Sequence, residues 1–214
     1  MTTKTEHAIP MHRNRRVVKL VIALLLMHSF GMVSCKDDPV PKPRAYLRLE
    51  YPQADYTRVD IDLPFTFEKN NWATKLSVRE VEGTTRSYGI DLSYPNMKGT
   101  IYLTYKAIEG RRENLIAFLK DAQNFTQKHT IKADEIREQA FIDDKKKLYG
   151  MFYEVGGNAA SQSQFYVTDS MRHFLTGSLY FYAKPNYDSI LPAAHYLQQD
   201  IKHIMETVQW QSIE

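Results

Sequence analysis

Cys35 is the single cysteine in the chain of 214 residues, and its surroundings limit what its thiol can do. Four Arg or Lys side chains stand between residues 13 and 19, an apolar run follows at 20–27, and small residues precede Cys35. This order is typical of a secretory signal, with a permanent signal anchor as the alternative. The apolar run is about half of the ~20 residues that a membrane-spanning helix requires. The tract after Cys35, at 36–44, is charged and rich in proline, so no core can bury the thiol there.

The residues directly before Cys35 indicate a covalent modification. MVSC, at 32–35, resembles a bacterial lipobox, in which apolar and small residues precede the cysteine. The resemblance implies transfer of diacylglycerol to Cys35, cleavage before it and acylation of the new amino terminus. We therefore predict a lipoprotein signal peptide at 1–34, the lipidated cysteine with a Pro-rich tether at 35–45, and one domain at 46–214.

A glycine-rich stretch, GGNAAS at 156–161, has letters that occur in phosphate-binding loops. Such a loop needs a following lysine and the start of a helix, whereas these glycines stand between two predicted strands. A hairpin connection with an exposed tip is therefore favoured. Its small side chains leave backbone groups accessible, so the predicted partner-binding residues are Gly156, Gly157, Asn158, Ala159, Ala160 and Ser161.

Asp169, Ser170 and His173 have the residue types of a hydrolase triad. A nucleophile in that role needs a sharp turn from a strand into a helix, flanked by glycines. The segment TDSMRH, at 168–173, is instead typical of a β-turn. We therefore predict no catalytic residue here.

The remaining histidines lie on or near predicted helices. His195 and His203 flank the apolar stripe of the last helix on different sides, and with Glu206 they could bind a metal. Surface or boundary positions are favoured over a metal site, so no metal and no cofactor is predicted. His129 follows a helix and is expected to cap its carbonyls. A partner contact through His129 and Lys132 is the other possibility.

Alternation of apolar and polar residues predicts the strands that must position these groups. Strands are predicted at 88–94 and 99–107, joined by a turn, and later at 147–155, 163–170 and 172–183. The segment 147–155 is apolar on both faces, which is typical of a central strand. Their connectors are too short for crossovers, so the strands are predicted to be antiparallel.

Two helices are predicted from apolar residues at helical spacing. The first stripe consists of Leu115, Phe118, Leu119, Ala122 and Phe125, and the second of Ile190, Ala194, Leu197, Ile201, Ile204 and Val208. Asp188 and Ser189 offer caps for the second helix. The predicted order is strands, a helix, three strands and a helix, which gives an α+β fold with helices packed on a mostly antiparallel sheet.

The charge balance excludes one class of function. Residues 1–34 hold five of the 28 Lys and Arg residues and one of the 25 Asp and Glu residues, which leaves 23 basic and 24 acidic groups. A nucleic-acid surface needs clustered basic residues, so no nucleic-acid partner is expected. With Cys35 acylated, no thiol remains for a disulfide or a thiolate metal site.

Several stretches resemble the gliding-motility lipoprotein GldD family of the Bacteroidetes over nearly the whole mature chain. They are VPKPRAYLRLEYP, PFTFE, KGTIYLTYK, KHTIKADEIRE, LYGMFYEVGGNAASQSQFYVTDSMRHFLTGSLYF and DIKHIMETVQW. The resemblance implies a lipid-anchored envelope protein needed for gliding motility and type IX secretion, with other envelope lipoproteins or membrane proteins as partners. The order of elements also resembles the PsbP/Mog1-like sandwich. We expect the periplasmic side of the outer membrane, with the cell surface as the alternative because CKDD resembles a surface-export signal.

Three kinds of function are compatible with these observations. A binding or scaffold module is favoured, and an exposed apolar patch would support it. An envelope hydrolase acting on peptidoglycan or polysaccharide would need a cleft with paired carboxylates of raised pKa. Carriage of a small ligand or lipid would need a deep apolar pocket.

Overall fold

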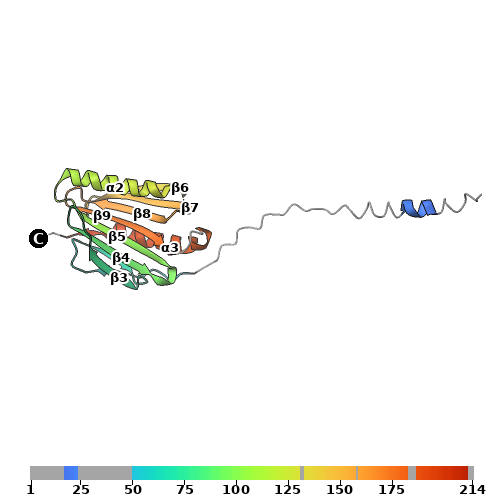
Figure 1. The fold of residues 1–214 in the computed structure, drawn as a ribbon. Coiled ribbons are helices and arrows are strands. Elements are labelled where there is room, and N and C mark those ends of the chain that lie inside the picture. The colour runs from blue at the N-terminus through green and yellow to red at the C-terminus, as the bar shows by residue number, and fades with distance from the viewer. Residues whose placement is uncertain (1–16, 24–49, 131–132, 158, 183–186, 212–214) are drawn as a thin grey trace, which may run out of the picture. The chain divides into compact units, whose positions relative to one another are not determined.

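The chain divides into two compact units, residues Met1–Ala45 and Tyr46–Glu214. The structure, a computed structural model, describes residues 17–23, 50–130, 133–157, 159–182 and 187–211, without the side chains of 125–130, 134, 187 and 188. In the first unit, residues 17–23 form a helix with exposed side chains (Figure 1). Among the described residues, no helix combines the length and the apolar character needed to cross a membrane.

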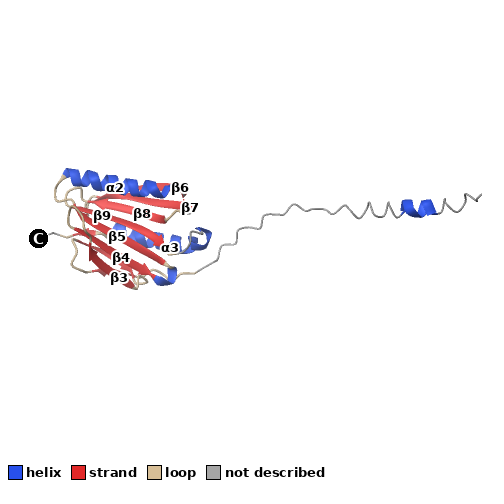
Figure 2. Cartoon of the chain, in the orientation of Figure 1, coloured by secondary structure: helices blue, strands red, loops and turns tan. Residues whose placement is uncertain are grey.

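The second unit is built on an antiparallel sheet that has seven strands within the described ranges (Figure 2). Its order across the sheet is β3-β4-β5-β9-β8-β7-β6. The strands are β3 (Lys75–Glu80), β4 (Ser87–Tyr94), β5 (Gly99–Ala107), β6 (Ala133–Asp143), β7 (Leu148–Gly157), β8 (Ser161–Thr168) and β9 (His173–Phe181). Every neighbouring pair is antiparallel, which confirms the prediction from the short connectors.

One face of this sheet carries the main core. Helix α3 (Tyr187–Thr207) packs there together with a small antiparallel sheet of order β1-β2-β10. The strands of the small sheet are β1 (Tyr56–Val59), β2 (Phe65–Asn70) and β10 (Gln209–Trp210). Leu197 and Ile201 of α3 are fully buried in the same core as Phe65 and Phe67 of β2, so the predicted apolar stripe of the last helix is confirmed.

The opposite face of the large sheet carries helix α2 (Arg112–Thr130), drawn along the sheet in Figure 1. Phe118 of α2 packs against Ile108 and Phe174, whereas Leu175, the next residue in β9, points into the main core. The sheet therefore lies between α2 on one face and α3 with the small sheet on the other. The predicted α+β fold with helices on an antiparallel sheet is confirmed.

The predicted turn between β4 and β5 is present, and a second turn joins β6 to β7. The short 3-10 helix η1 (Pro95–Met97) joins β4 to β5, and Lys98 after it has a left-handed backbone with a φ of 51°. Residues 143–147 form the hairpin tip between β6 and β7, where Asp143 accepts backbone N–H groups through its side chain. Lys147 leaves this tip with a φ of 54°.

Three details of the predicted order are wrong. In the described part of the chain four strands, β6 to β9, separate the two helices, whereas three were predicted, because β6 was not predicted. β6 is an edge strand with one neighbour, so water can solvate its side chains and its sequence lacks clean alternation. β7 is consequently next to the edge and not central. Helix α3 begins at Tyr187, before both predicted capping residues, Asp188 and Ser189.

Candidate functional site

Asp169, Ser170 and His173 build a turn between β8 and β9 and do not form a triad. Asp169 Oδ1 accepts the backbone N–H groups of Met171, Arg172 and His173 at 3.0, 2.7 and 2.8 Å. Ser170 has a left-handed backbone with a φ of 66°. The carboxylate therefore holds the turn together, and the prediction of a β-turn is confirmed.

The ring of His173 belongs to the core. Its Nδ1 lies 2.9 Å from the hydroxyl of Tyr105, and the ring stacks on Trp210 with 5.0 Å between centroids. The side chain is 4% exposed, and burial lowers its pKa below the usual 6.5. Its hydrogen-bonding nitrogen is directed at Tyr105, so His173 is not placed to activate Ser170.

The two histidines of α3, His195 and His203, do not come together in a metal site within the described residues. His203 Nε2 lies 2.8 Å from Glu68 Oε2 of β2, and its ring stacks on Tyr56. His195 is exposed on the surface of the helix. In the described part of the chain, no group of three or more His, Cys, Asp or Glu side chains could hold a metal ion.

The predicted partner-binding loop is only partly exposed. Gly157 ends β7 with a φ of 88°, which favours glycine, and Ala160 is exposed. Ala159 and Ser161 are 3% and 0% exposed, because the chain turns back into the sheet here and Ser161 is the first residue of β8. The expectation of an exposed tip is therefore wrong for these two residues. Asn158, Lys132 and Cys35 lie outside the described residues, and His129 lies in the last turn of α2, where its side chain is not described.

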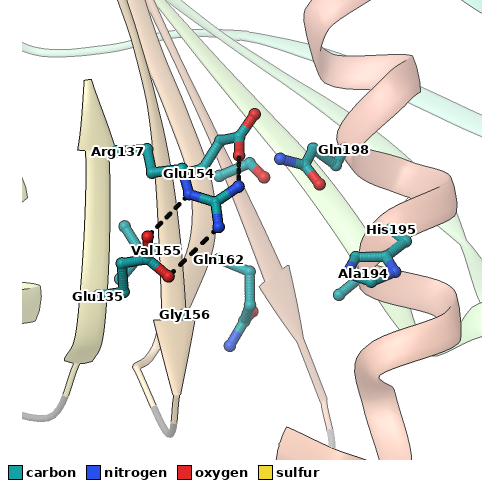
Figure 3. A pocket seen from close by; sticks show the side chains of 10 residues that line it. Glu135, Arg137, Glu154, Val155, Gly156, Gln162, Ala194, His195 and Gln198 are labelled. Atoms are coloured by element: carbon teal, nitrogen blue, oxygen red, sulfur yellow. Dashed lines mark hydrogen bonds and ion pairs between the residues drawn. The ribbon is translucent and has the colours of Figure 1, made fainter. Parts of the chain in front are cut away.

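A cavity of about 120 Å³ lies beside this loop, where β6, β7 and β8 face helix α3 (Figure 3). We call it the strand-end cavity. It is lined by Glu135 and Arg137 from β6, Glu154, Val155 and Gly156 from β7, Gln162 and Ser163 from β8, and Ala194, His195 and Gln198 from α3. Of the predicted loop residues that the structure describes, Gly156 lines the cavity, as does Gln162, which follows the loop.

Two irregularities in the strand pairing shape the strand-end cavity. The register between β6 and β7 shifts between Ala133 and Glu135, and the register between β8 and β9 shifts between Ser161 and Gln164. Bulges of this kind bend a strand and redirect its side chains, and they are frequent beside functional sites. Both bulges occur at the end of the sheet where β7 finishes, and Gln162 and Ser163 lie within the second one.

Gln162 and Ser163 have polar atoms with unused hydrogen-bonding capacity. Gln162 donates through Nε2 to the carbonyl oxygen of Ala159 at 2.7 Å, but its Oε1 has no partner. The Oγ of Ser163 is also buried without a partner. A buried polar atom left unsatisfied costs roughly 1–3 kcal/mol, so a ligand that supplied a donor and an acceptor here would recover free energy.

Arg137 and two carboxylates form the charged part of the cavity lining (Figure 3). The Nε of Arg137 lies 2.8 Å from Glu135 Oε1, and its Nη1 lies 3.9 Å from Glu154 Oε2. The hydrogen bond and the charge of Arg137 lower the pKa of Glu135. A lowered pKa keeps Glu135 ionised, which is the opposite of what a general acid requires.

A second polar cluster lies in the core around Asp200 of α3, which is 1% exposed. Tyr56 donates its hydroxyl to Asp200 Oδ1 at 2.7 Å, and Asn70 Nδ2 lies 3.1 and 3.0 Å from the two carboxylate oxygens. Burial raises the pKa of Asp200. Because its oxygens bind side chains from β1 and β2, the cluster attaches the small sheet to α3.

A larger space, about 270 Å³, lies between α2 and the large sheet. Its walls include the rings of Tyr102, Tyr153, Tyr166 and Phe174, and Lys106 forms an ion pair with Asp121 at 3.4 Å. This groove is the feature of the described chain that best fits the carriage of a small ligand.

Sequence reasoning missed most residues of the strand-end cavity. Arg137 and Glu154 are ordinary charged residues of strands, and Gln198 is one of two adjacent glutamines on a helix. They meet because of strand register and helix packing, for which one sequence has no local pattern. Bulges at Asp134 and at Gln162 were equally absent from the alternation pattern.

The fold and the cavity define an α+β domain with a polar site at one end of an antiparallel sheet. Comparison with known families gives a match to the gliding motility lipoprotein GldD over residues 36–210. The chain therefore belongs to the gliding motility lipoprotein GldD family, as its sequence resemblance implied. No curated protein and no solved structure matches the chain, so the likeness to the PsbP/Mog1-like sandwich stays a prediction.

Proposed function

We propose that this protein is a lipid-anchored binding module of the gliding and type IX secretion machinery. Cys35 carries the lipid, the Pro-rich tether separates the domain from the membrane, and the strand-end cavity docks a partner protein of the envelope. The anchor lies in the outer membrane with the domain on its periplasmic side. Membership of the family supports the link to gliding motility.

The strand-end cavity is the observation that carries this proposal. Its lining includes Gln162 and Ser163, whose Oε1 and Oγ atoms are buried and have no hydrogen-bond partner in the described part of the chain. Both sit on a strand of the large sheet, so a bound group would meet a rigid surface. A site that recognises a partner needs such fixed, unused polar groups.

The envelope hydrolase is less well supported by the same site. Glu135 and Glu154 both face Arg137, and the hydrogen bond and charge of Arg137 lower the pKa of Glu135, so Glu135 does not serve as a protonated acid. The triad-like residues form a turn in which Asp169 bonds to backbone groups. A binding role requires neither of these groups to react.

Filling the strand-end cavity tests the proposal. Gln198→Trp places a bulky uncharged ring at the cavity, and Gln199→Trp makes the same change at the adjacent exposed position, which does not line it. We expect Gln198→Trp to reduce colony spreading and cargo secretion to the level of a deletion strain. Gln199→Trp should leave both unchanged. Circular dichroism of each purified full-length variant checks that folding is intact.

Two further variants separate the alternatives. Ala160→Arg adds bulk on the exposed part of the loop and should act like Gln198→Trp. Ser170→Gly removes the hydroxyl without strain, because a φ of 66° suits glycine, and function should be retained. Normal spreading by a folded Gln198→Trp strain would end the docking proposal, and loss of function in a folded Ser170→Gly strain would favour the hydrolase.

A further inference from the structure

A second surface, at the other end of β7, brings four cationic side chains together. A shallow cleft of about 440 Å³ lies where the β6–β7 tip, the β8–β9 turn and β10 come together. We call it the basic cleft. It is lined by Lys145, Lys146, Lys147, Asp169, Arg172, His173, Gln209, Trp210 and Gln211. Four cationic side chains therefore face one carboxylate, in a mature chain whose overall charge is close to zero.

The acidic groups near the basic cleft are already engaged. Asp169 accepts three backbone N–H groups of its own turn. Asp143 accepts two in the hairpin tip. Asp144 is hydrogen-bonded to Tyr149, which follows the core residue Leu148 and so points to the opposite face of the sheet. Asp169 and Asp143 keep their negative charge while they bind backbone groups, and Asp144 faces away, so the four cations of the cleft meet two nearby carboxylates.

The cations themselves differ in what they contact. Lys146 donates to the carbonyl oxygen of Glu206 at 2.6 Å and lies 3.8 Å from Asp143. Lys145, Lys147 and Arg172 form no ion pair with any residue in the described part of the chain. All three side chains are exposed. A hairpin tip and a tight turn fix the backbone positions of these residues, so their charges are presented on one surface.

The other side chains at the basic cleft are of the kinds found in protein interfaces. Met171 is 64% exposed beside Arg172, and Trp210 is partly exposed on the small sheet. Trp, Met and Arg are enriched where proteins meet. Trp210 also donates through Nε1 to the carbonyl oxygen of Lys147 at 3.1 Å, which fixes its ring against the hairpin tip. An open cleft with a rigid aromatic ring fits a polypeptide better than an enclosed small anion.

We propose that the basic cleft binds an acidic segment of a partner protein, whose carboxylates pair with Lys145, Lys147 and Arg172. This rests on the proposed role as a binding module but not on the strand-end cavity, because the two sites share no lining residue. Trp210 supplies the apolar contact beside the charges. The protein would then contact partners at both ends of its large sheet.

Fluorescence anisotropy with a labelled peptide of about ten glutamates tests this site on the full-length protein in detergent. We expect binding that weakens as salt rises, because exposed charge pairs are screened. Lys145→Glu combined with Arg172→Glu should weaken binding by about tenfold or more. The matched control, Lys75→Glu combined with Lys120→Glu, makes the same charge change at exposed positions of β3 and α2 and should bind like the wild type.

The contrary outcomes are distinct. Equal weakening in both double variants would mean that only net charge matters, and absence of peptide binding would remove the site; either result overturns the proposal. Displacement of the peptide by inorganic phosphate or dihexanoyl-phosphatidylglycerol at equal ionic strength would identify a small-anion or lipid site instead. If Gln198→Trp abolishes spreading while the peptide fails to bind, the binding module stands and this inference alone falls.

Discussion

Residue type is a poor guide to role in this protein, because some polar side chains bind backbone groups and others bind side chains. Asp169 has the residue type of a triad member, yet its carboxylate binds three N–H groups of one turn. Asp200 has no motif around it, yet it joins the small sheet to α3. A carboxylate that accepts backbone donors stabilises a turn, and one that is buried must find side-chain donors.

The buried His173 should make stability depend on pH. Its pKa in the folded protein lies below the usual 6.5, so between those two values the unfolded chain binds more protons than the folded one. The free energy of unfolding should therefore fall as pH drops below 6.5 towards the lowered pKa. Denaturant unfolding of the full-length protein at about pH 7.5 and 5.5 measures the loss.

The control for this prediction is His173→Gln, which removes the titrating ring and keeps a polar group near Tyr105. We expect the variant to be less stable at neutral pH but to lose less stability between the two pH values than the wild type. An identical loss in both proteins would show that other groups cause the pH dependence.

At the scale of the element, the two helices cover opposite faces of the large sheet and differ in how much they contribute to the core. Helix α3 buries Leu197, Ile201 and Ile204 completely between the large sheet and β2. Helix α2 covers the other face through a smaller cluster around Phe118, and its Ile116 is 55% exposed. The main core therefore depends on α3 much more than on α2.

Leu197→Ala should lower the free energy of unfolding by roughly 2–5 kcal/mol, the usual range for removing a buried leucine side chain. Leu197 also approaches Gly99 of β5 closely, so the lost side chain leaves a gap directly on the sheet. Ile116→Ala, on the exposed side of α2, should change stability by about 0.5 kcal/mol or less. Denaturant unfolding of both variants gives the comparison, and equal small effects would contradict the role assigned to α3.

At the scale of the whole molecule, attachment and recognition are assigned to different parts of the chain. The predicted lipid site, Cys35, precedes a tether, and the two candidate binding surfaces lie at opposite ends of the strands of one rigid sheet. Under the proposed function, one domain connects two partners while the predicted lipid at Cys35 keeps it at a membrane. This arrangement is the reason for treating the protein as a connector in the proposed machinery.

Replacing the predicted acylation site tests the anchor. Cys35→Ala should abolish incorporation of radioactive palmitate and stop processing of the signal peptide, because no other cysteine exists in the chain. Undiminished palmitate label in the variant would refute lipidation at Cys35.

Much of the fold was predictable because it depends on local patterns. Alternation at 88–94 and 99–107 identified β4 and β5, the stripe through Leu197 identified α3, and short connectors implied antiparallel pairing. These patterns are visible in the sequence because each helix or strand buries one face, whichever elements it packs against. The family was recognisable for a related reason, since its stretches extend along most of the mature chain.

The sites, by contrast, were decided by tertiary structure. Strand β6 has one neighbour and therefore shows no alternation, although it contributes Arg137 to the strand-end cavity. Gln162 lies within a bulge of β8, and Gln198 of α3 lines the same cavity from the helix side. Lys145 lies in the β6–β7 tip and Arg172 in the β8–β9 turn, and the pairing register of the strands brings these two turns together. A sequence determines which faces are apolar, but contacts between distant segments depend on register and packing, which no local pattern encodes.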